Sequence, residues 1–469
     1  MQSSTEALLA RFQSVGRWLS DYWLDGRRIL VVSHIDADGI CSGSIAFTAL
    51  VRKGANVSVR CIPELDPATI AGLASQRFDL CLFTDLGSSL VKELDAALGG
   101  KFVVVDHHQI TEEDLRHKSV VNAWGFGLDG GKEACSSTMA YFFARTLDPA
   151  NRDLAPLAVI GAVADRQDGG SARSLTGLNQ EALNDTQSGR AVTVTEDLLF
   201  TGRETRPIHE SVALTTPPFI RGVTGNRDGV LAALHQSGMR LQEGRAWRSV
   251  SSLSPEERMK LTEVLAGLAA GVPGATASIA GLVGTVYTLE GEDPFTPLRD
   301  AREFATLLNA CGRMGRAGVG IAICLGDRGS QLASATDALS EYRSGLGKAL
   351  SALSADRSRI ELSSSLVIVR GEGLVEDRLL GPVISIMAAS PDNSDKVVIG
   401  FADSDEESLK VSSRVGDAFP GEVNLAAIMR SAAEAVGGVG GGHEMAAGAK
   451  IARTRRDEFR RLVEEAVGV

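Results

Sequence analysis

Two carboxylates two residues apart and an Asp-His-His tripeptide are the side chains of this sequence best suited to chemistry. Asp36 and Asp38 follow one apolar run, and Asp106, His107 and His108 follow another. Carboxylate oxygens and neutral imidazoles suit Mn²⁺, Mg²⁺ or Zn²⁺, and carboxylates packed this closely would repel one another unless cations lay between them. The pattern predicts a divalent-metal site, and two bridged cations about 3.5–4 Å apart are the usual arrangement for phosphoester hydrolysis.

Two further acids extend this pattern. Asp85 follows the apolar run at 80–84, and Asp165 follows the run at 159–164. We expect these runs to be strands, because a parallel α/β sheet brings the carboxyl ends of its strands to one crevice. Asp85 on its own could instead be a helix N-cap or turn residue, and the Asp-His-His tripeptide could form a hydrogen-bonded polar network. The order of all four segments favours the metal site.

The four segments resemble those of the DHH phosphoesterase family, which includes RecJ-type exonucleases, oligoribonucleases and cyclic-dinucleotide phosphodiesterases. The resemblance extends to residues 440–448, which read Gly-Gly-Gly-His-Glu-Met-Ala-Ala-Gly. This stretch is similar to the substrate-gripping motif of the C-terminal domain that accompanies many DHH domains. Residues 33–39 and 302–313 look most like those of archaeal RecJ-like nucleases.

The resemblance implies two divalent metal ions, with Mn²⁺ favoured over Mg²⁺. The implied metal ligands are His34, Asp36, Asp38, Asp85, His107 and Asp165. Asp36 and Asp38 would bind different ions, with Asp85 bridging them. Several relatives carry the first ligand farther upstream than His34, where this chain has Val32 or its neighbours. Asp106 is expected to orient an imidazole from behind, and His108 to face the substrate phosphate. The implied substrate contacts are Ser412, Arg414, Gly441, Gly442 and His443.

The implied activity is that of a RecJ-like exonuclease, which releases nucleotides from single-stranded DNA or RNA by two-metal hydrolysis. One alternative is a phosphodiesterase of short oligonucleotides or cyclic dinucleotides, because such relatives share the metal motifs. A second alternative is a scaffold for replisome or repair helicase subunits with secondary nuclease activity, because some DHH relatives have become silent replication factors.

Alternating apolar and helical stretches predict an α/β protein in several parts. We expect a DHH catalytic domain at 1–214 with a doubly wound, mostly parallel sheet. A helical inserted or bridging segment at 215–300 and a connection at 301–355 would follow. A smaller α/β substrate-binding domain is expected at 356–469, with the active-site cleft between the two lobes. Residues 318–325 read as a strand, and the glycines near 440 as a turn between two helices.

Composition sets limits on partners and location. The net charge of −11 over 469 residues argues against a polyanionic substrate, although acids that bind metals contribute to it. Basic residues gather at Arg302, Arg313 and Arg316, and again at Lys450, Arg453, Arg455, Arg456, Arg460 and Arg461. The second group could equally be the solvated face of a final helix. The sequence has no span that predicts a membrane helix or a signal peptide, so we expect a cytoplasmic protein with reduced, buried cysteines.

Overall fold

The computed structural model describes residues 4–24, 26–216, 218–271 and 275–468, which divide into two compact units. The first unit spans residues 1–211, 241–258 and 283–339, and the second spans 212–240, 259–282 and 340–469. No helix in these described stretches is long and apolar enough to cross a membrane.

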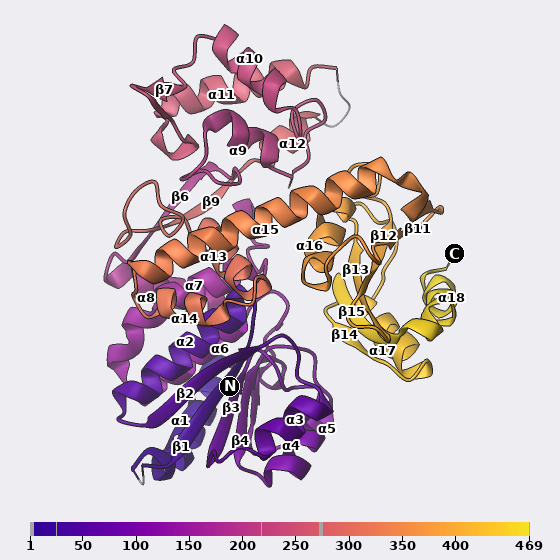
Figure 1. Cartoon of the computed structure of the whole chain (residues 1–469). Helices are drawn as coiled ribbons and strands as arrows, with labels where there is room; N and C mark the ends of the chain where they lie inside the picture. Colours follow the sequence, from indigo (N-terminus) through magenta and orange to yellow (C-terminus); the bar gives the residue numbers. More distant parts are fainter. Residues whose placement is uncertain (1–3, 25, 217, 272–274, 469) are drawn as a thin grey trace. The chain divides into compact units, whose positions relative to one another are not determined.

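A five-stranded parallel sheet forms the centre of the first unit (Figure 1). Its strand order is β2-β1-β3-β4-β5, and the strands are β1 (Arg28–His34), β2 (Asn56–Ile62), β3 (Leu80–Thr84), β4 (Phe102–Asp106) and β5 (Val120–Asn122). Strands β1, β3, β4 and β5 are almost wholly buried because helices cover both faces, as the predicted doubly wound fold requires, whereas the edge strand β2 is largely exposed or half-buried.

Side chains alternate between the two faces of the sheet. Leu30, Val32, Phe83 and Val104 pack against α3 (Pro67–Ala74) and α4 (Val91–Leu98). The opposite side carries α2 (Ala37–Arg52), which packs against α6 (Ser136–Leu147) and α7 (Ala155–Ala164). The remaining helices that lie wholly in this unit are α1 (Ser4–Leu24), α5 (Glu112–Leu115), α8 (Gly177–Ser188), α13 (Ala301–Arg313) and α14 (Ala317–Cys324).

Two predicted strands are helices. Residues 159–164 belong to α7, and residues 318–325 lie mostly in α14. Both segments are apolar without a clear period, so periodicity alone does not separate a buried strand from a buried helix. Pro156 at the start of α7 was the available helix signal. In α14 the small Gly320 lies against Ile40, where a Cβ would come within 3.0 Å of a side-chain methyl carbon.

Residues 199–282 form an insertion between two paired strands. The antiparallel pair β6 (Val192–Leu198) and β9 (Val283–Leu289) flanks it, and β7 (Gln242–Glu243) pairs with β8 (Ala246–Trp247). Its helices are α9 (Ile208–Leu214), α10 (Arg227–Gln236), α11 (Pro255–Leu268) and α12 (Ala275–Ala280). The long helix α15 (Ser330–Ala355) precedes the C-terminal sheet.

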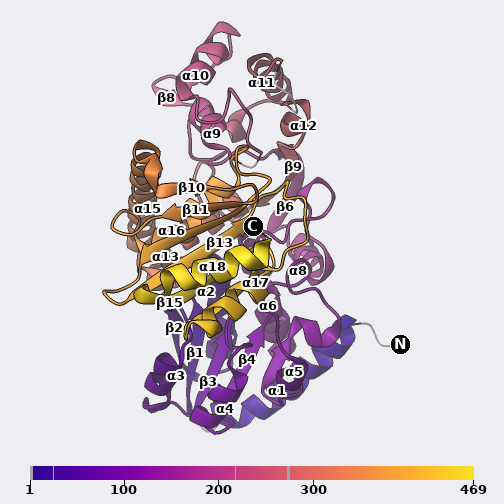
Figure 2. The same cartoon turned by 90° about the vertical axis from the view of Figure 1, so that its right-hand side faces the viewer.

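The second unit contains a six-stranded mixed sheet with the order β10-β11-β12-β13-β15-β14. Its strands are β10 (Ile360–Leu362), β11 (Leu366–Arg370), β12 (Val397–Asp403), β13 (Ser408–Val415), β14 (Val439–Gly442) and β15 (Ala446–Ala452). Figure 2 looks onto α17 (Leu425–Ala435) and α18 (Arg456–Val467), whose apolar side chains pack on one face of the sheet. Helix α16 (Asp377–Ala388) packs against β12 and β13. The glycines near 440 form the edge strand β14 rather than the predicted turn, and only 443–445 turn the chain.

Candidate metal centre

The loop that joins β1 to α2 places three of the predicted ligands. His34 ends β1, and Asp36 is the N-cap of α2, where its carboxylate accepts a hydrogen bond from Gly39 N at 2.9 Å. His34 Nδ1 lies 2.8 Å from Asp36 Oδ2 and 3.7 Å from Asp85 Oδ2. Gly39 cannot carry a side chain, because a Cβ there would lie 2.3 Å from the His34 carbonyl oxygen.

Asp38 lies in the first turn of α2, and its carboxylate reaches the N-terminus of α6. Its Oδ2 accepts a hydrogen bond from Ser136 N at 2.8 Å, and its Oδ1 accepts one from Ser137 N at 2.9 Å. Free N–H groups and the helix dipole both stabilise a carboxylate at this position. These two hydrogen bonds fix the start of α6 relative to α2.

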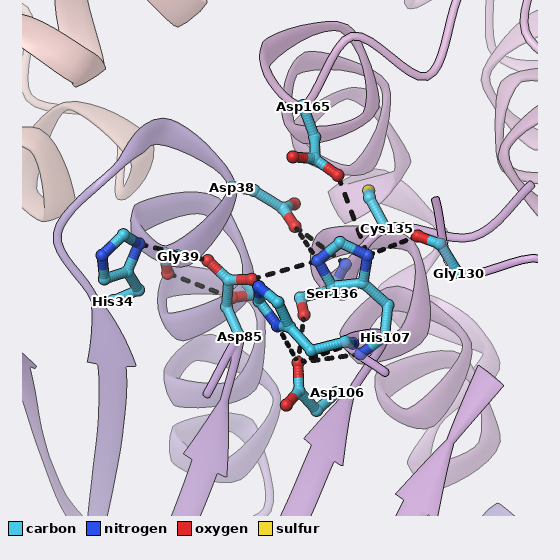
Figure 3. Close-up of polar contacts among 12 residues, drawn as sticks. His34, Asp38, Gly39, Asp85, Asp106, His107, Gly130, Cys135, Ser136 and Asp165 are labelled. Atoms are coloured by element: carbon cyan, nitrogen blue, oxygen red, sulfur yellow. Dashed lines mark hydrogen bonds and ion pairs between the residues drawn. The ribbon is translucent and has the colours of Figure 1, made fainter. Parts of the chain in front are cut away.

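His107 lies at the middle of the cluster (Figure 3). Its Nε2 is 3.3 Å from Asp85 Oδ1 and 3.9 Å from Asp38 Oδ2. Its Nδ1 is 2.6 Å from the Gly130 carbonyl oxygen and 3.7 Å from Asp165 Oδ2. Because a carbonyl only accepts hydrogen bonds, Nδ1 carries a proton, and Nε2 is the nitrogen available to a cation.

Asp106 lies behind the histidines. Its Oδ1 accepts hydrogen bonds from His107 N and from His108 Nδ1, both at 2.8 Å, and its Oδ2 accepts one from Ser88 N at 3.2 Å. Burial alone would raise the pKa of Asp106, but the neighbouring His108 and the hydrogen bonds lower it well below its usual range. The imidazole that Asp106 contacts is that of His108, since its bond to His107 is to the backbone N–H. The role of Asp106 stays a prediction.

Like charges dominate the electrostatics. Burial, together with the neighbouring Asp36 and Asp38, raises the pKa of Asp85 well above its usual range. Burial also raises the pKa of Asp165 to about 6, although His107 opposes this. Burial would lower the pKa of His107, but the surrounding carboxylates raise it well above its ordinary value. Without cations, the protein offsets the negative charge of these carboxylates by holding protons on them and on His107. Bound cations would neutralise that charge themselves.

The donor atoms gather into two groups that fit divalent cations. One group is His34, Asp36 and Asp85, and the other is Asp38, His107 and Asp165, each with ligand atoms within 4.8 Å of one another. Oxygen-rich shells with one imidazole each suit Mn²⁺ and Mg²⁺. The structure thus brings together the six residues predicted as ligands, although Asp165 comes from the C-cap of helix α7 and not from a strand.

Family models match three parts of the chain. The N-terminal domain of the DHH family matches residues 28–162, the DHH-CID domain matches 199–283, and the DHHA1 domain matches 373–468. The chain belongs to the DHH phosphoesterase family. A protein of Methanocaldococcus jannaschii is 26% identical over 458 residues, which cover 94% of this chain and 93% of that protein.

Solved structures share the DHH fold. RecJ from Thermus thermophilus in complex with Mn²⁺ has a TM-score of 0.59 at 17% identity, covering 97% of this chain but only 54% of RecJ. A second structure of that RecJ, in complex with Mg²⁺, has a TM-score of 0.53 at 17% identity over 97% of this chain and 52% of RecJ. Cdc45 from Entamoeba histolytica has a TM-score of 0.67 at 12% identity, covering 98% of this chain and 99% of that one. The match to the DHH family indicates a hydrolase that cleaves phosphodiester bonds.

The predicted substrate contacts gather on neighbouring strands of the DHHA1 domain. Ser412 of β13 and Gly441 of β14 both pair with Gly448 of β15, so they flank the same point of the sheet. Arg414 donates from Nη1 to Ser412 Oγ at 3.3 Å and from Nε to Ser385 Oγ at 2.9 Å. Gly442 ends β14, and His443 N donates to Ala446 O at 2.8 Å in the turn that follows. Their contact with substrate stays a prediction.

The basic cluster of the C-terminus is neutralised by acids. The six pairs are Lys450 with Asp405, Arg453 with Asp403, Arg455 with Glu458, Arg456 with Glu372, Arg460 with Glu361, and Arg461 with Glu465. These pairs favour the interpretation of the cluster as a solvated face. Near the DHH site, Arg302 is likewise paired with the buried Asp168.

Sequence reasoning missed the groups that hold the ligands in place. The helix α13 contacts the metal loop, where Asn309 Oδ1 accepts a hydrogen bond from Ala37 N at 3.0 Å. A Cβ at Gly312 would lie 1.7 Å from the Ile35 carbonyl oxygen, so the two backbones touch. Backbone groups such as Gly130 O leave no signal in a sequence. The motif at 302–313 was the one signal that pointed to α13.

Proposed function

We propose that this chain is a metal-dependent RecJ-like exonuclease that releases nucleotides from single-stranded DNA or RNA with two divalent cations, Mn²⁺ in preference to Mg²⁺. The observation that carries the proposal is the position of Asp85 between two donor groups. Its Oδ2 faces His34 at 3.7 Å and its Oδ1 faces His107 at 3.3 Å. A carboxylate with one oxygen toward each group is suited to bridge two cations.

The chain's own residues would divide the work. His34 and Asp36 would hold one cation, and Asp38, His107 and Asp165 the other. Bound divalent cations would polarise the scissile phosphate and lower the pKa of the attacking water. His108, whose ring Asp106 orients at 2.8 Å, would donate a hydrogen bond to a phosphoryl oxygen, where charge develops in the transition state.

The test is digestion of end-labelled single-stranded DNA and RNA of several lengths, with Mn²⁺, with Mg²⁺ and with chelator. Asp85→Asn is the informative variant, because Asp38→Ala would also remove the cap of α6. Asp95→Asn, in the exposed part of α4, is the matched control. We expect metal-dependent laddering by the wild type and the control, and none by Asp85→Asn. Full activity in Asp85→Asn would refute the proposal.

A second candidate is a phosphodiesterase of short oligonucleotides or cyclic dinucleotides. The pairing of the C-terminal basic side chains with acids favours it, because paired charges in a protein with a net charge of −11 give little attraction for a long polyanion. Activity confined to dinucleotides in the same assay would support this candidate. Absence of activity on every substrate would favour the scaffold, which the shared Cdc45 fold also fits.

A further inference from the structure

A chain of buried amide side chains runs from the start of α6 to Asp165. Asn179 on α8 is fully buried, and Gln167, which follows α7, is 1% exposed. Asn179 Nδ2 lies 2.7 Å from Gln167 Oε1, and Gln167 Nε2 lies 2.8 Å from Asp165 Oδ2 and 2.8 Å from Gly130 O. Of these hydrogen-bonded side chains, Asp165 belongs to the predicted metal ligands, and Asn179 and Gln167 do not.

The hydrogen bonds fix which way each amide points. Asn179 Oδ1 accepts from Cys135 N at 3.2 Å and from Thr138 Oγ1 at 2.7 Å, so its Nδ2 must be the atom that faces Gln167. Gln167 therefore presents its oxygen to Asn179 and its NH₂ group to the other side. That NH₂ group has two donors, and Asp165 Oδ2 and Gly130 O take one each.

Gly130 O also connects Gln167 to His107. This carbonyl accepts hydrogen bonds from both His107 Nδ1, at 2.6 Å, and Gln167 Nε2. Gln167 thus contacts two of the three donors of one cation group. It donates a hydrogen bond to Asp165, and it reaches His107 through the shared carbonyl, with Gln167 Nε2 also 3.4 Å from His107 Nδ1. Partners of this kind fix the tautomer and orientation of metal ligands.

The backbone around Gln167 is strained. Helix α7 ends with hydrogen bonds from Arg166 N to Val163 O and from Gln167 N to Ala162 O, a termination that normally places glycine at the left-handed position. Arg166 occupies that position with a φ of +57°. Non-glycine residues persist in such a conformation where the surrounding structure over-determines it, which occurs most often at functional sites. The strain is consistent with a segment held in place by its neighbours.

We infer that Gln167 is a positioning residue that aims Asp165 and His107 at one cation, with its amide orientation set by Asn179. The inference rests on the proposed function, because it assigns Gln167 a role in that same site. It predicts that a change at Asn179, which does not touch the ligands, weakens metal binding through Gln167.

The experiment is a calorimetric Mn²⁺ titration of the full chain, with thermal unfolding in chelator as the measure of the fold. Gln167→Met keeps the size of the side chain and removes both donors. We expect its dissociation constant for Mn²⁺ to rise about 10–100-fold, the usual loss when such a partner is removed. Asn151→Ala is the matched control, because it removes a fully buried amide that bonds to Ala144 O, away from the ligands. It should bind Mn²⁺ as the wild type does.

Asn179→Asp is the second variant and decides the case if Gln167→Met does not fold. It keeps the acceptor for Cys135 and Thr138 but places an oxygen opposite Gln167 Oε1. The Gln167 amide must then flip and turn its oxygen toward Asp165, which should weaken Mn²⁺ binding. The added negative charge alone would strengthen binding, so the direction of the change separates the two effects.

Unchanged or tighter Mn²⁺ binding in the folded variants would overturn the inference while leaving the proposed function intact. A wild type that binds no Mn²⁺ would overturn both. Weaker binding in Gln167→Met and Asn179→Asp, with the control unaffected, would support the inference.

Discussion

Glu303→Gln should stabilise the protein at alkaline pH and have little effect in acid. Glu303 lies on α13 and is 6% exposed. Its Oε1 accepts a hydrogen bond from Glu204 N and its Oε2 one from Thr205 Oγ1, both at 2.6 Å. Burial and the neighbouring Asp300 raise the pKa of Glu303 to about 7, from 4.5 for an unperturbed glutamate. A glutamine has the same shape and can keep both contacts.

The sign follows from proton linkage. Between pH 4.5 and 7 the folded state holds a proton on Glu303 that the unfolded state has released, so stability falls as pH rises through this window. Below the unfolded pKa both states are protonated and nothing is lost. Each pKa unit corresponds to about 1.4 kcal/mol, so the difference between 4.5 and about 7 amounts to roughly 3 kcal/mol at pH 8. Glu303→Gln removes the ionisation and should recover most of that free energy.

The assay is denaturant unfolding of wild type and variant at pH 4 and pH 8. At each pH we take the difference in unfolding free energy between variant and wild type, and we then compare this difference at pH 4 and pH 8. Other titrating groups contribute equally to variant and wild type and therefore cancel. We expect this difference to grow by about 3 kcal/mol in favour of Gln. Glu64→Gln, at an exposed position, should show no such growth. An equal difference at both pH values would refute the reasoning.

Three further changes have definite expected outcomes. Asp85→Asn should raise the melting temperature in chelator, because it removes a buried carboxylate that lies among other carboxylates. It should also abolish the stabilisation by Mn²⁺, which for the wild type is about 2.7 kcal/mol at a Mn²⁺ concentration one hundred times the dissociation constant. Arg166→Gly should relieve the left-handed strain and stabilise the fold by about 1 kcal/mol in denaturant unfolding, and a loss of stability would contradict the strain. Gly312→Ala should cost about 1–3 kcal/mol and lower hydrolysis, because its Cβ would lie 1.7 Å from Ile35 O; normal stability and turnover would show that α13 is free to shift.

Strands β1, β3 and β4 of the parallel sheet could be predicted because each is a short apolar run with an acid at or just after its end. The three acids that follow β1 and β3, and the histidines after β4, are where parallel strands must place them. The sequence also predicts the two helices on either side of the glycines near 440, since their apolar faces repeat with helical period. These features are local, and local patterns survive in a single sequence.

Other features depend on packing and could not be predicted. Helix α7 is buried on nearly every side, so its sequence lacks the polar face that marks a helix. The glycines near 440 form an edge strand because Gly440 lies against the Met429 carbonyl, where a Cβ would be 2.3 Å away, a constraint set by α17 and not by the glycines themselves. Gln167 and Asn179 are ordinary polar residues until the fold brings them together. Their role is a property of contacts between distant segments.

Asp38 is both a proposed metal ligand and the acceptor of two hydrogen bonds from the N-terminus of α6, and this combination constrains how the protein can evolve. Asp38 caps α6 with both oxygens, whereas Asp85 has its pKa raised by burial among like charges and accepts no such pair of backbone bonds. A lineage that abandoned catalysis would gain stability by replacing Asp85 and lose it by replacing Asp38. Inactive descendants should therefore discard the bridging acid first and keep Asp38 as a vestige. An intact Asp38 alone would be a poor sign of activity, and the residue at position 85 a far better one.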